Sequence, residues 1–175
     1  KKRIIALGLL WCLSAVMLQA ARVDTVLVRS AAMNKDVKVV YVLPDKAIGK
    51  QACPVVYLLH GYGGNARSWV QLKPELPQMA DEKGIIFVCP DGKNSWYWDS
   101  PENPAYRYET FVTSELVKYT DGNYATIPDR KARAISGLSM GGHGALWSAI
   151  RHKDVFGAAG SMSGGVDIRP FPQNW

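Results

Sequence analysis

The sequence has 175 residues, enough for one domain with a hydrophobic core, and its 47% hydrophobic content with 16 glycines and 10 prolines is typical of a globular protein. This composition argues against a disordered, coiled-coil or collagen-like chain. The formal net charge is +6, but 21 basic residues are interspersed with 15 acidic ones, so no basic stripe in the sequence indicates a nucleic-acid partner.

A secretory signal peptide is predicted over residues 1–20. The basic start KKR precedes the apolar run IIALGLLWCLSAVML and then QAAR, and the first acidic residue is Asp24. The alternative is a membrane anchor, but the apolar run is shorter than the roughly 20 residues that span a bilayer. We therefore expect cleavage after Ala20 or Ala21, export to the periplasm or the extracellular space, and no stable membrane span after cleavage.

Strand patterns open the remaining chain. In residues 22–30 and 36–44, β-branched residues alternate partly with polar ones, which predicts an antiparallel pair near a sheet edge. PVVYLLH (54–60) and GIIFVCP (84–90) are continuous apolar runs, which are typical of strands covered on both faces.

Helical patterns separate the later strands. Residues 68–84 are long enough for a helical crossover whose start Pro74 and Pro77 shorten or bend. The apolar spacing of residues 108–124 predicts an amphipathic helix that ends near Gly122. KARAISGLS, MGGHGALWSAIRHK and FGAAGSMSG follow as a strand, a helix and a small-residue strand. Repeated strand–helix–strand units predict an α/β fold with a mostly parallel sheet and helices on both faces.

Two cysteines, Cys53 and Cys89, follow the predicted signal peptide. Cys53 opens one apolar strand and Cys89 closes another, so in a parallel sheet their sulfurs lie near opposite edges, whereas a disulfide needs α-carbons within about 7 Å. We expect two buried free thiols. The histidines and cysteines lack the spacing of metal ligands, and we expect no metal and no cofactor.

A possible nucleophile lies where a predicted strand meets a predicted helix. Gly137, Ser139 and Gly141 form the pattern G-x-S-x-G. At such a turn the serine backbone is strained, and glycines are needed where a β-carbon would collide with neighbouring chain. The alternative is a glycine-rich helix start without catalytic meaning. The flanking strand and helix favour Ser139 as a nucleophile.

Acyl transfer also needs hydrogen-bond donors for the oxyanion. The expected donors are the backbone N–H of Met140, directly after the serine, and one from the loop after an earlier strand. The stretch LLHGYGGN ends such a strand, and Tyr62 is the first candidate there, with Gly63 next. The alternative is a plain tight turn with glycines at positive φ.

An aromatic loop follows the strand that ends at Cys89. Trp96, Tyr97 and Trp98 are large flat side chains on the catalytic side of the predicted sheet. They suit a pocket wall that binds an aromatic acyl group or a sugar ring. The alternative is that these aromatics only pack the loop against the domain.

The stretches HGYGGN, SWYWDSP, GLSMGGHGAL and AAGSMSGG, in that order, resemble the esterase D type branch of the α/β-hydrolase family. This branch includes feruloyl and acetylxylan esterases, short-chain acyl esterases, S-formylglutathione hydrolases and mycolyltransferases. The resemblance implies an α/β-hydrolase domain over residues 22–175, with Ser139 as nucleophile and an oxyanion role near Tyr62.

A serine nucleophile needs a base, and the chain has three histidines. The resemblance gives His60 a structural role in the oxyanion loop. His152 lies about 20 Å from the start of the helix that follows Ser139, because an α-helix rises 1.5 Å per residue. His143 is close in sequence, but a side chain in the first helical turn projects sideways, whereas the turn lifts the serine out of the sheet.

The catalytic acid is missing from the pattern as well. After Ser139 the acidic residues are Asp154 and Asp167, and Asp167 comes earlier than the family places its acid. We therefore expect that the chain is incomplete, that the last strands, the acid and the histidine lie beyond it, and that these 175 residues alone have little or no esterase activity.

The leading hypothesis is an exported serine esterase that hydrolyses acyl, feruloyl or acetyl esters of carbohydrates through a serine acyl-enzyme, with a small-molecule or polysaccharide ester as substrate. A general short-chain carboxylesterase or an enzyme like S-formylglutathione hydrolase is the alternative among enzymes, although glutathione conjugates are cytosolic and export disfavours them. A carbohydrate-binding relative that has lost catalysis is the alternative from another class.

Overall fold

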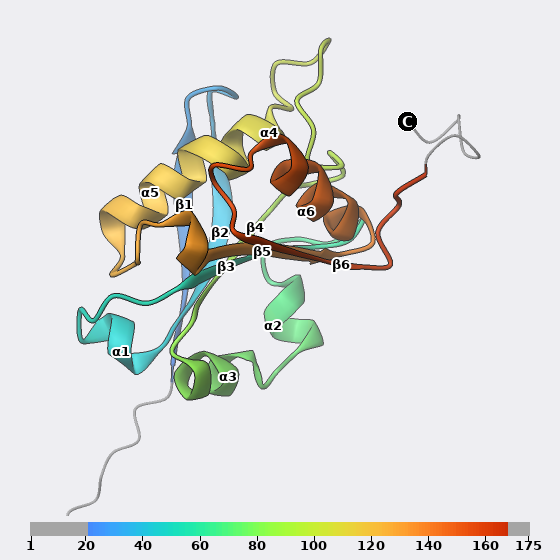
Figure 1. Cartoon of the computed structure of the whole chain (residues 1–175). Helices are drawn as coiled ribbons and strands as arrows, with labels where there is room; N and C mark the ends of the chain where they lie inside the picture. The colour runs from blue at the N-terminus through green and yellow to red at the C-terminus, as the bar shows by residue number, and fades with distance from the viewer. Residues whose placement is uncertain (1–20, 168–175) are drawn as a thin grey trace, which may run out of the picture.

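The computed structural model describes residues 21–167, so the predicted signal peptide lies outside the described residues. A six-stranded sheet with the order β1-β2-β4-β3-β5-β6 forms the centre of the domain (Figure 1). Its strands are β1 (Arg22–Ser30), β2 (Lys35–Leu43), β3 (Val55–Leu59), β4 (Ile86–Pro90), β5 (Arg133–Leu138) and β6 (Ala158–Met162). The helical segments are α1 (Asp45–Ile48), α2 (Ser68–Leu72), α3 (Leu76–Lys83), α4 (Tyr108–Thr110), the π-helical turn η1 (Phe111–Glu115), α5 (Leu116–Asn123), the 3₁₀ turn η2 (Arg130–Ala132) and α6 (Met140–Arg151).

Strand directions confirm a mostly parallel sheet. β3 runs parallel to both β4 and β5, and β5 runs parallel to β6, whereas β2 is antiparallel to β1 and to β4. The predicted antiparallel pair lies at the edge of the sheet, and Asn34, with φ of 51°, closes its turn. Asparagine tolerates this left-handed conformation better than most residues.

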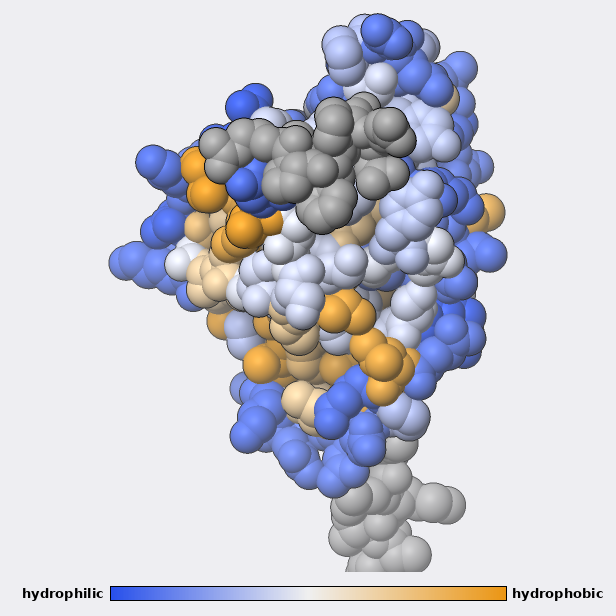
Figure 2. All heavy atoms as spheres, turned by 90° about the vertical axis from the view of Figure 1, so that its right-hand side faces the viewer, coloured by the Kyte–Doolittle hydropathy of each residue, from blue (hydrophilic) through white to orange (hydrophobic). Residues whose placement is uncertain are grey.

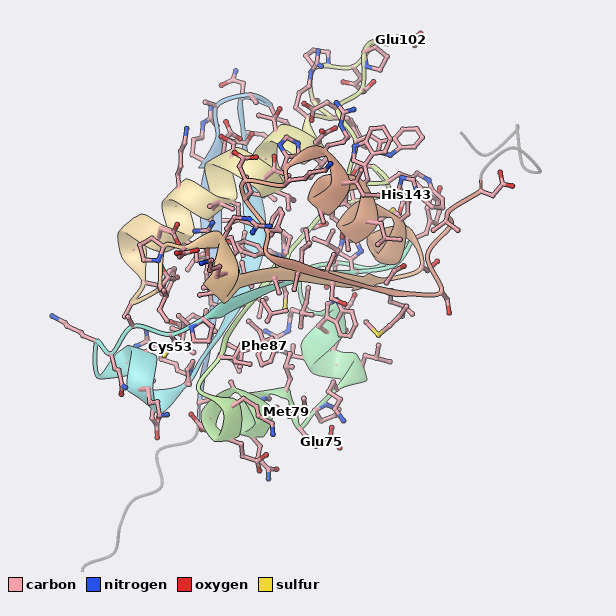
Figure 3. The ribbon with its side chains drawn as sticks, viewed as in Figure 1. Cys53, Glu75, Met79, Phe87, Glu102 and His143 are labelled. Atoms are coloured by element: carbon pink, nitrogen blue, oxygen red, sulfur yellow. The ribbon has the colours of Figure 1, made fainter. Side chains whose placement is uncertain are left out.

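Helices cover both faces of the sheet, as the sequence predicts. Figure 1 shows α4, α5 and α6 on one face and α2 and α3 on the other. Alternate residues of β2 feed two separate cores because successive side chains of a strand point to opposite faces. Tyr41 belongs to the core under α5, and Val40 and Val42 belong to the core over α3. Figure 3 labels Phe87 of this second core and Met79, which packs against it.

Two short helices replace the single crossover helix expected over residues 68–84. α2 ends before Lys73, and α3 begins at Leu76. Pro74 disfavours helical backbone at the residue before it, which explains the break. Pro77 lies in the first turn of α3, where the missing N–H costs no helical hydrogen bond. Gly84 ends α3 in the left-handed conformation, with φ of 64°.

The predicted helix over residues 108–124 is observed as the continuous run α4, η1 and α5. Its inner side is buried through Phe111, Val112 and Leu116, each with 0% exposure. Thr120 shares a buried hydrogen bond of 2.9 Å with Tyr41 of β2. This run therefore fixes the layer above the amino-terminal half of the sheet.

Both remaining cysteines are buried and free, as predicted. Among residues 21–167 no helix is long and apolar enough to cross a membrane.

Figure 2 shows apolar side chains that reach the surface on the side of the domain at the right of Figure 1. Leu72 of α2 and Met162 of β6 are 62% and 42% exposed.

Leu116 tests the packing of this layer. Replacement of Leu116 by alanine removes a fully buried side chain, and we expect the free energy of unfolding to fall by about 2–5 kcal/mol. Leu72→Ala is the matched control, because Leu72 is 62% exposed and its loss should change stability by less than about 0.5 kcal/mol. Urea denaturation followed by circular dichroism measures both, and equal effects would contradict the assignment of the core.

Candidate active site

Ser139 lies at the carboxyl end of the sheet, directly after β5 and as the N-cap of α6. Its backbone has φ of 54° and ψ of −116°, a sparsely populated conformation that costs roughly 1–3 kcal/mol for a residue with a β-carbon. The Ser139 N–H donates to the Met162 carbonyl at 2.8 Å, which ties the turn to β6. Ser139 is exposed to solvent. Strain and exposure together are the geometry of a nucleophile elbow.

The glycines around Ser139 are required by the close approach of three backbone segments. A β-carbon on Gly137 would lie 2.2 Å from the Gly141 carbonyl oxygen. A β-carbon on Gly141 would lie 2.2 Å from the Leu59 carbonyl oxygen. Both distances are far below van der Waals contact, so the G-x-S-x-G spacing follows from packing against the end of β3.

The loop after β3 reaches the serine. A β-carbon built on Gly61 would lie 3.6 Å from the Ser139 Cβ, so the two turns are in contact. The N–H groups of Tyr62 and Met140 donate to no acceptor within residues 21–167. For Met140 this follows from its place at the start of α6, where the first N–H groups have no partner within the helix. These two donors remain the candidates for an oxyanion hole.

Gly63, the second candidate donor in the loop after β3, is not available for an oxyanion. Its N–H donates to the Asn94 side-chain oxygen at 2.8 Å, so the group is already used. Asn94 belongs to the aromatic loop, which therefore braces the oxyanion loop from the side. No local pattern indicates this contact, because the two residues are 31 positions apart.

His60 is a buried structural residue, as the resemblance implied. It is 2% exposed, and its Nδ1 donates to the Gly61 carbonyl at 2.7 Å. Its Nε2 accepts from the Gly92 N–H at 2.9 Å. The imidazole thus joins the loops that follow β3 and β4, and both nitrogens are occupied.

His152 takes part in a cluster around the buried carboxylate of Glu109. Its Nε2 lies 2.8 Å from Glu109 Oε1, which also accepts from Arg151 Nε at 2.7 Å. The indole N–H of Trp147 donates to the other oxygen at 2.7 Å. Burial alone would raise the pKa of Glu109, but the hydrogen bonds from Arg151, Trp147 and His152 outweigh it and hold that pKa below its usual range. Sequence reasoning missed Glu109.

His143 faces the aromatic loop (Figure 3). Its Nε2 accepts from the indole N–H of Trp98 at 2.7 Å, and its Nδ1 donates to the Gly165 carbonyl at 2.7 Å. Burial lowers the pKa of His143, and the bond to Gly165 offsets this in part. Because both nitrogens are engaged away from Ser139, His143 does not have the geometry of its base.

The three aromatic residues of the predicted wall lie in different environments. Trp96 is half-buried, and its ring centroid lies 6.4 Å from that of Tyr62. Trp98 is half-buried beside His143. Tyr97, expected to contact substrate, is instead fully buried, and its hydroxyl donates to the His60 carbonyl at 3.3 Å. Trp98 lines the groove beside α6, Trp96 lies next to Tyr62, and Tyr97 holds the loop from behind.

The backbone of this loop is strained. Lys93, Trp96 and Tyr97 have φ of 51°, 56° and 60°, in the left-handed region that residues with a β-carbon avoid. Side-chain contacts must therefore hold the loop in place. Glu102 marks its outer tip, at the top of Figure 3.

A groove of about 1010 Å³ lies on the outer side of α6, away from Ser139. It is lined by the Glu109 cluster together with Trp98, Thr113, Lys118 and Asp154. Asp154 is therefore at the far end of α6 from the serine. Within the described part of the chain, no group of histidine, cysteine or acidic residues could hold a metal ion.

Comparison with known proteins gives a consistent result. The family model described as "Putative esterase" matches residues 30–175. An acetyl esterase from Caldicellulosiruptor saccharolyticus is 28% identical over 135 residues, which is 73% of this chain and 50% of that protein. The MPT51/MPB51 antigen of Mycobacterium bovis is 33% identical over 149 residues, 83% of this chain and 46% of that protein. The chain spans about half the length of these curated relatives.

Solved structures share the fold. A ferulic acid esterase has a TM-score of 0.75 and 31% identity, covering 89% of this chain and 64% of that one. An S-formylglutathione hydrolase from Agrobacterium tumefaciens has a TM-score of 0.71 and 28% identity, covering 81% of this chain and 57% of that one.

The glycine spacing can be tested directly. Replacement of Gly141 by alanine forces a β-carbon against the Leu59 carbonyl, and we expect the free energy of unfolding to fall by about 3 kcal/mol or more. The control is Gly122→Ala in α5, where a β-carbon meets nothing within 4 Å. Alanine there should stabilise the helix by roughly 0.5–1 kcal/mol. Thermal denaturation of both variants decides, and a stable Gly141→Ala protein would refute the packing argument.

Proposed function

The chain belongs to the esterase family whose model matches residues 30–175, and on this premise we propose that the protein is an exported serine esterase acting on carboxylic esters. The observation that carries the proposal is Ser139, exposed at a strained strand-to-helix turn against the Gly61 loop. A serine nucleophile of acyl transfer is held at a strained turn between a strand and a helix, with backbone N–H donors beside it, and Ser139 has each of these features.

The proposed reaction proceeds in two steps through an acyl-enzyme. Ser139 Oγ attacks the ester carbonyl carbon while a base takes the hydroxyl proton. The oxygen of the tetrahedral intermediate then accepts hydrogen bonds from the N–H groups of Met140 and Tyr62. Collapse breaks the bond to the alcohol, which leaves with the proton, and water hydrolyses the acyl-serine by the same route.

The base is none of the three histidines of this sequence. His60 and His143 have both ring nitrogens engaged, and His152 is held by Glu109 at the far end of α6. We therefore propose that the full-length protein supplies the base and its acid from outside these 175 residues. The same observation motivates the second candidate, a carbohydrate-binding relative without catalysis.

The proposed substrates are acyl esters of carbohydrates. The rings of Trp96 and Tyr62 lie side by side, with centroids 6.4 Å apart, and together offer flat apolar surface suited to an aromatic acyl group or a sugar ring. The similar proteins named acetyl esterase and ferulic acid esterase agree with this class. A short-chain carboxylesterase remains the alternative, and an S-formylglutathione hydrolase fits less well because its substrate is cytosolic.

The proposed cleavage after Ala20 would make Ala21 the first residue of the exported protein. This residue is 8% exposed, and its N–H donates to Asp81 Oδ2 at 2.7 Å. Cleavage after Ala20 would turn this N–H into a charged α-amino group beside a carboxylate. The other oxygen of Asp81 accepts from the Asp45 N–H at 2.8 Å, so the carboxylate is already oriented.

The nucleophile is tested on the full-length protein with a fluorophosphonate probe. Ser139→Ala should abolish labelling and lower kcat/KM for acetyl and feruloyl esters by about 10⁴-fold or more. Ser114→Ala, in the groove on the other side of α6, is the control and should label normally. The 175-residue chain alone should hydrolyse these esters no faster than buffer. Undiminished labelling of Ser139→Ala would reject the proposal, and a folded wild type that never labels would favour the binding relative.

The processing site is tested by sequencing the amino terminus of the protein after expression with its leader. We expect it to begin at Ala21. In that protein Asp81→Asn should lower the free energy of unfolding by up to about 1 kcal/mol at pH 7. An α-amino group beside a carboxylate has a pKa raised above roughly 7.7–8.0, so this difference is complete below about pH 7 and disappears as the pH rises through the raised value. A terminus at another residue, or a difference that grows with pH, would contradict the assignment.

A further inference from the structure

Two consecutive residues of α6 receive two consecutive residues of the aromatic loop. A β-carbon on Gly144 would lie 2.6 Å from the Tyr97 ring, so this ring occupies the space that a side chain would need. The preceding residue, His143, accepts the indole N–H of Trp98 at 2.7 Å. The loop is thus seated on the helix that begins at Ser139.

The hydrogen bonds of His143 require its neutral form. The indole of Trp98 is a donor only, so the Nε2 that accepts from it must be unprotonated. Nδ1 faces the Gly165 carbonyl, which can only accept, so this nitrogen carries the proton. A second proton on Nε2 would place two donors against each other and break the bond to Trp98.

Aromatic rings surround the imidazole. It stacks on Trp147 at an interplanar angle of 16° and meets Trp96 edge-on at 89° and 5.6 Å. The ring that accepts the Trp98 indole therefore also contacts Trp96, whose own ring lies beside that of Tyr62.

The charged groups of the elements around His143 have partners of their own. On α6, Arg151 lies over the Trp147 ring at 4.8 Å and binds Glu109 of α4. In the aromatic loop, Asp99 accepts from the backbone N–H and the hydroxyl of Thr110. Asp167, the charged residue nearest in sequence to Gly165 in the segment after β6, is exposed to solvent. Lys93, at the start of the loop, pairs with Asp91 at 2.9 Å.

We propose that His143 is a positioning residue whose neutral ring locks the aromatic loop in place, and that protonation of the ring releases Trp98 and with it Trp96, the ring beside Tyr62. The loss of substrate affinity that follows rests on the proposed esterase function, whereas the release of the loop does not. The substrate class is an ester with an aromatic acyl group or a sugar alcohol, because these are the groups that a tryptophan wall binds.

The lock is tested first on the 175-residue chain, without any activity. Nitrogen-15 NMR of the histidine rings should show His143 as the neutral tautomer protonated at Nδ1 at pH 7. The Trp98 indole proton should move and exchange faster with the same midpoint as His143, below the ordinary histidine pKa because burial lowers it. A tautomer protonated at Nε2, or an indole signal that is constant through the His143 titration, would overturn the lock.

The consequence for substrate is tested on the full-length enzyme. His143→Phe and Trp98→Phe should each raise KM for a feruloyl ester by about tenfold, with a smaller change in kcat. His143→Gln keeps an acceptor and a donor on one side chain, so it should restore most of the affinity and remove the rise of KM between pH 7 and pH 5. His152→Gln, on the same helix but in the Glu109 cluster, should leave KM and its pH dependence unchanged.

The possible failures are distinguishable. A His143→Phe enzyme that loses about 10⁴-fold in kcat with constant KM would make His143 the base and reject the positioning role. Equal KM values for all variants would also reject it. If Ser139→Ala remains active, the proposed function fails, while the NMR result still decides the lock.

Discussion

The close approach of three backbone segments at the end of the sheet is the constraint on which the site depends. The first turn of α6 packs so tightly on the end of β3 that Gly141 has no room for a β-carbon beside the Leu59 carbonyl. This contact forces the left-handed backbone of Ser139 and sets the height of its hydroxyl above the sheet. It also brings the Gly61 loop against Ser139, so the proposed nucleophile and the candidate oxyanion donors are brought together by the same packing.

The loops around the serine are joined to each other by buried polar groups. His60 connects the turn after β3 with Gly92 after β4, and Asn94 binds Gly63 from the aromatic loop. Tyr97 closes the arrangement by filling the space over Gly144. These contacts explain how a loop with strained residues keeps one conformation: each strained residue is adjacent to a side chain that is fixed elsewhere.

The fold followed from local patterns, and the site followed only in part. Continuous apolar runs identified β3 and β4, and the strand and helix around Ser139 identified the elbow, because both signals are carried by residues close in sequence. Pro74 splits the crossover into two helices because it disfavours helical backbone at the preceding residue, whereas the pattern predicted one helix with a shortened or bent start. The burial of Tyr97 and the capture of Gly63 by Asn94 could not be predicted, since partners more than thirty positions away decide them. The carboxylate of Glu109 escaped notice for the same reason, with donors that lie 38 to 43 positions later in the chain.

The Glu109 cluster has a mechanical consequence for α6. Its three donors, Trp147, Arg151 and His152, lie on one side of the last turns of the helix. Three hydrogen bonds to one carboxylate oppose rotation of the helix about its long axis, a motion that would also turn Ser139 at the other end. Because the pKa of Glu109 is lowered, this stabilisation is present above the carboxyl's ordinary titration range and is lost only when the pH falls through the lowered value. The orientation of Ser139 should therefore persist in mildly acidic surroundings, the conditions in which we propose that the aromatic loop is released.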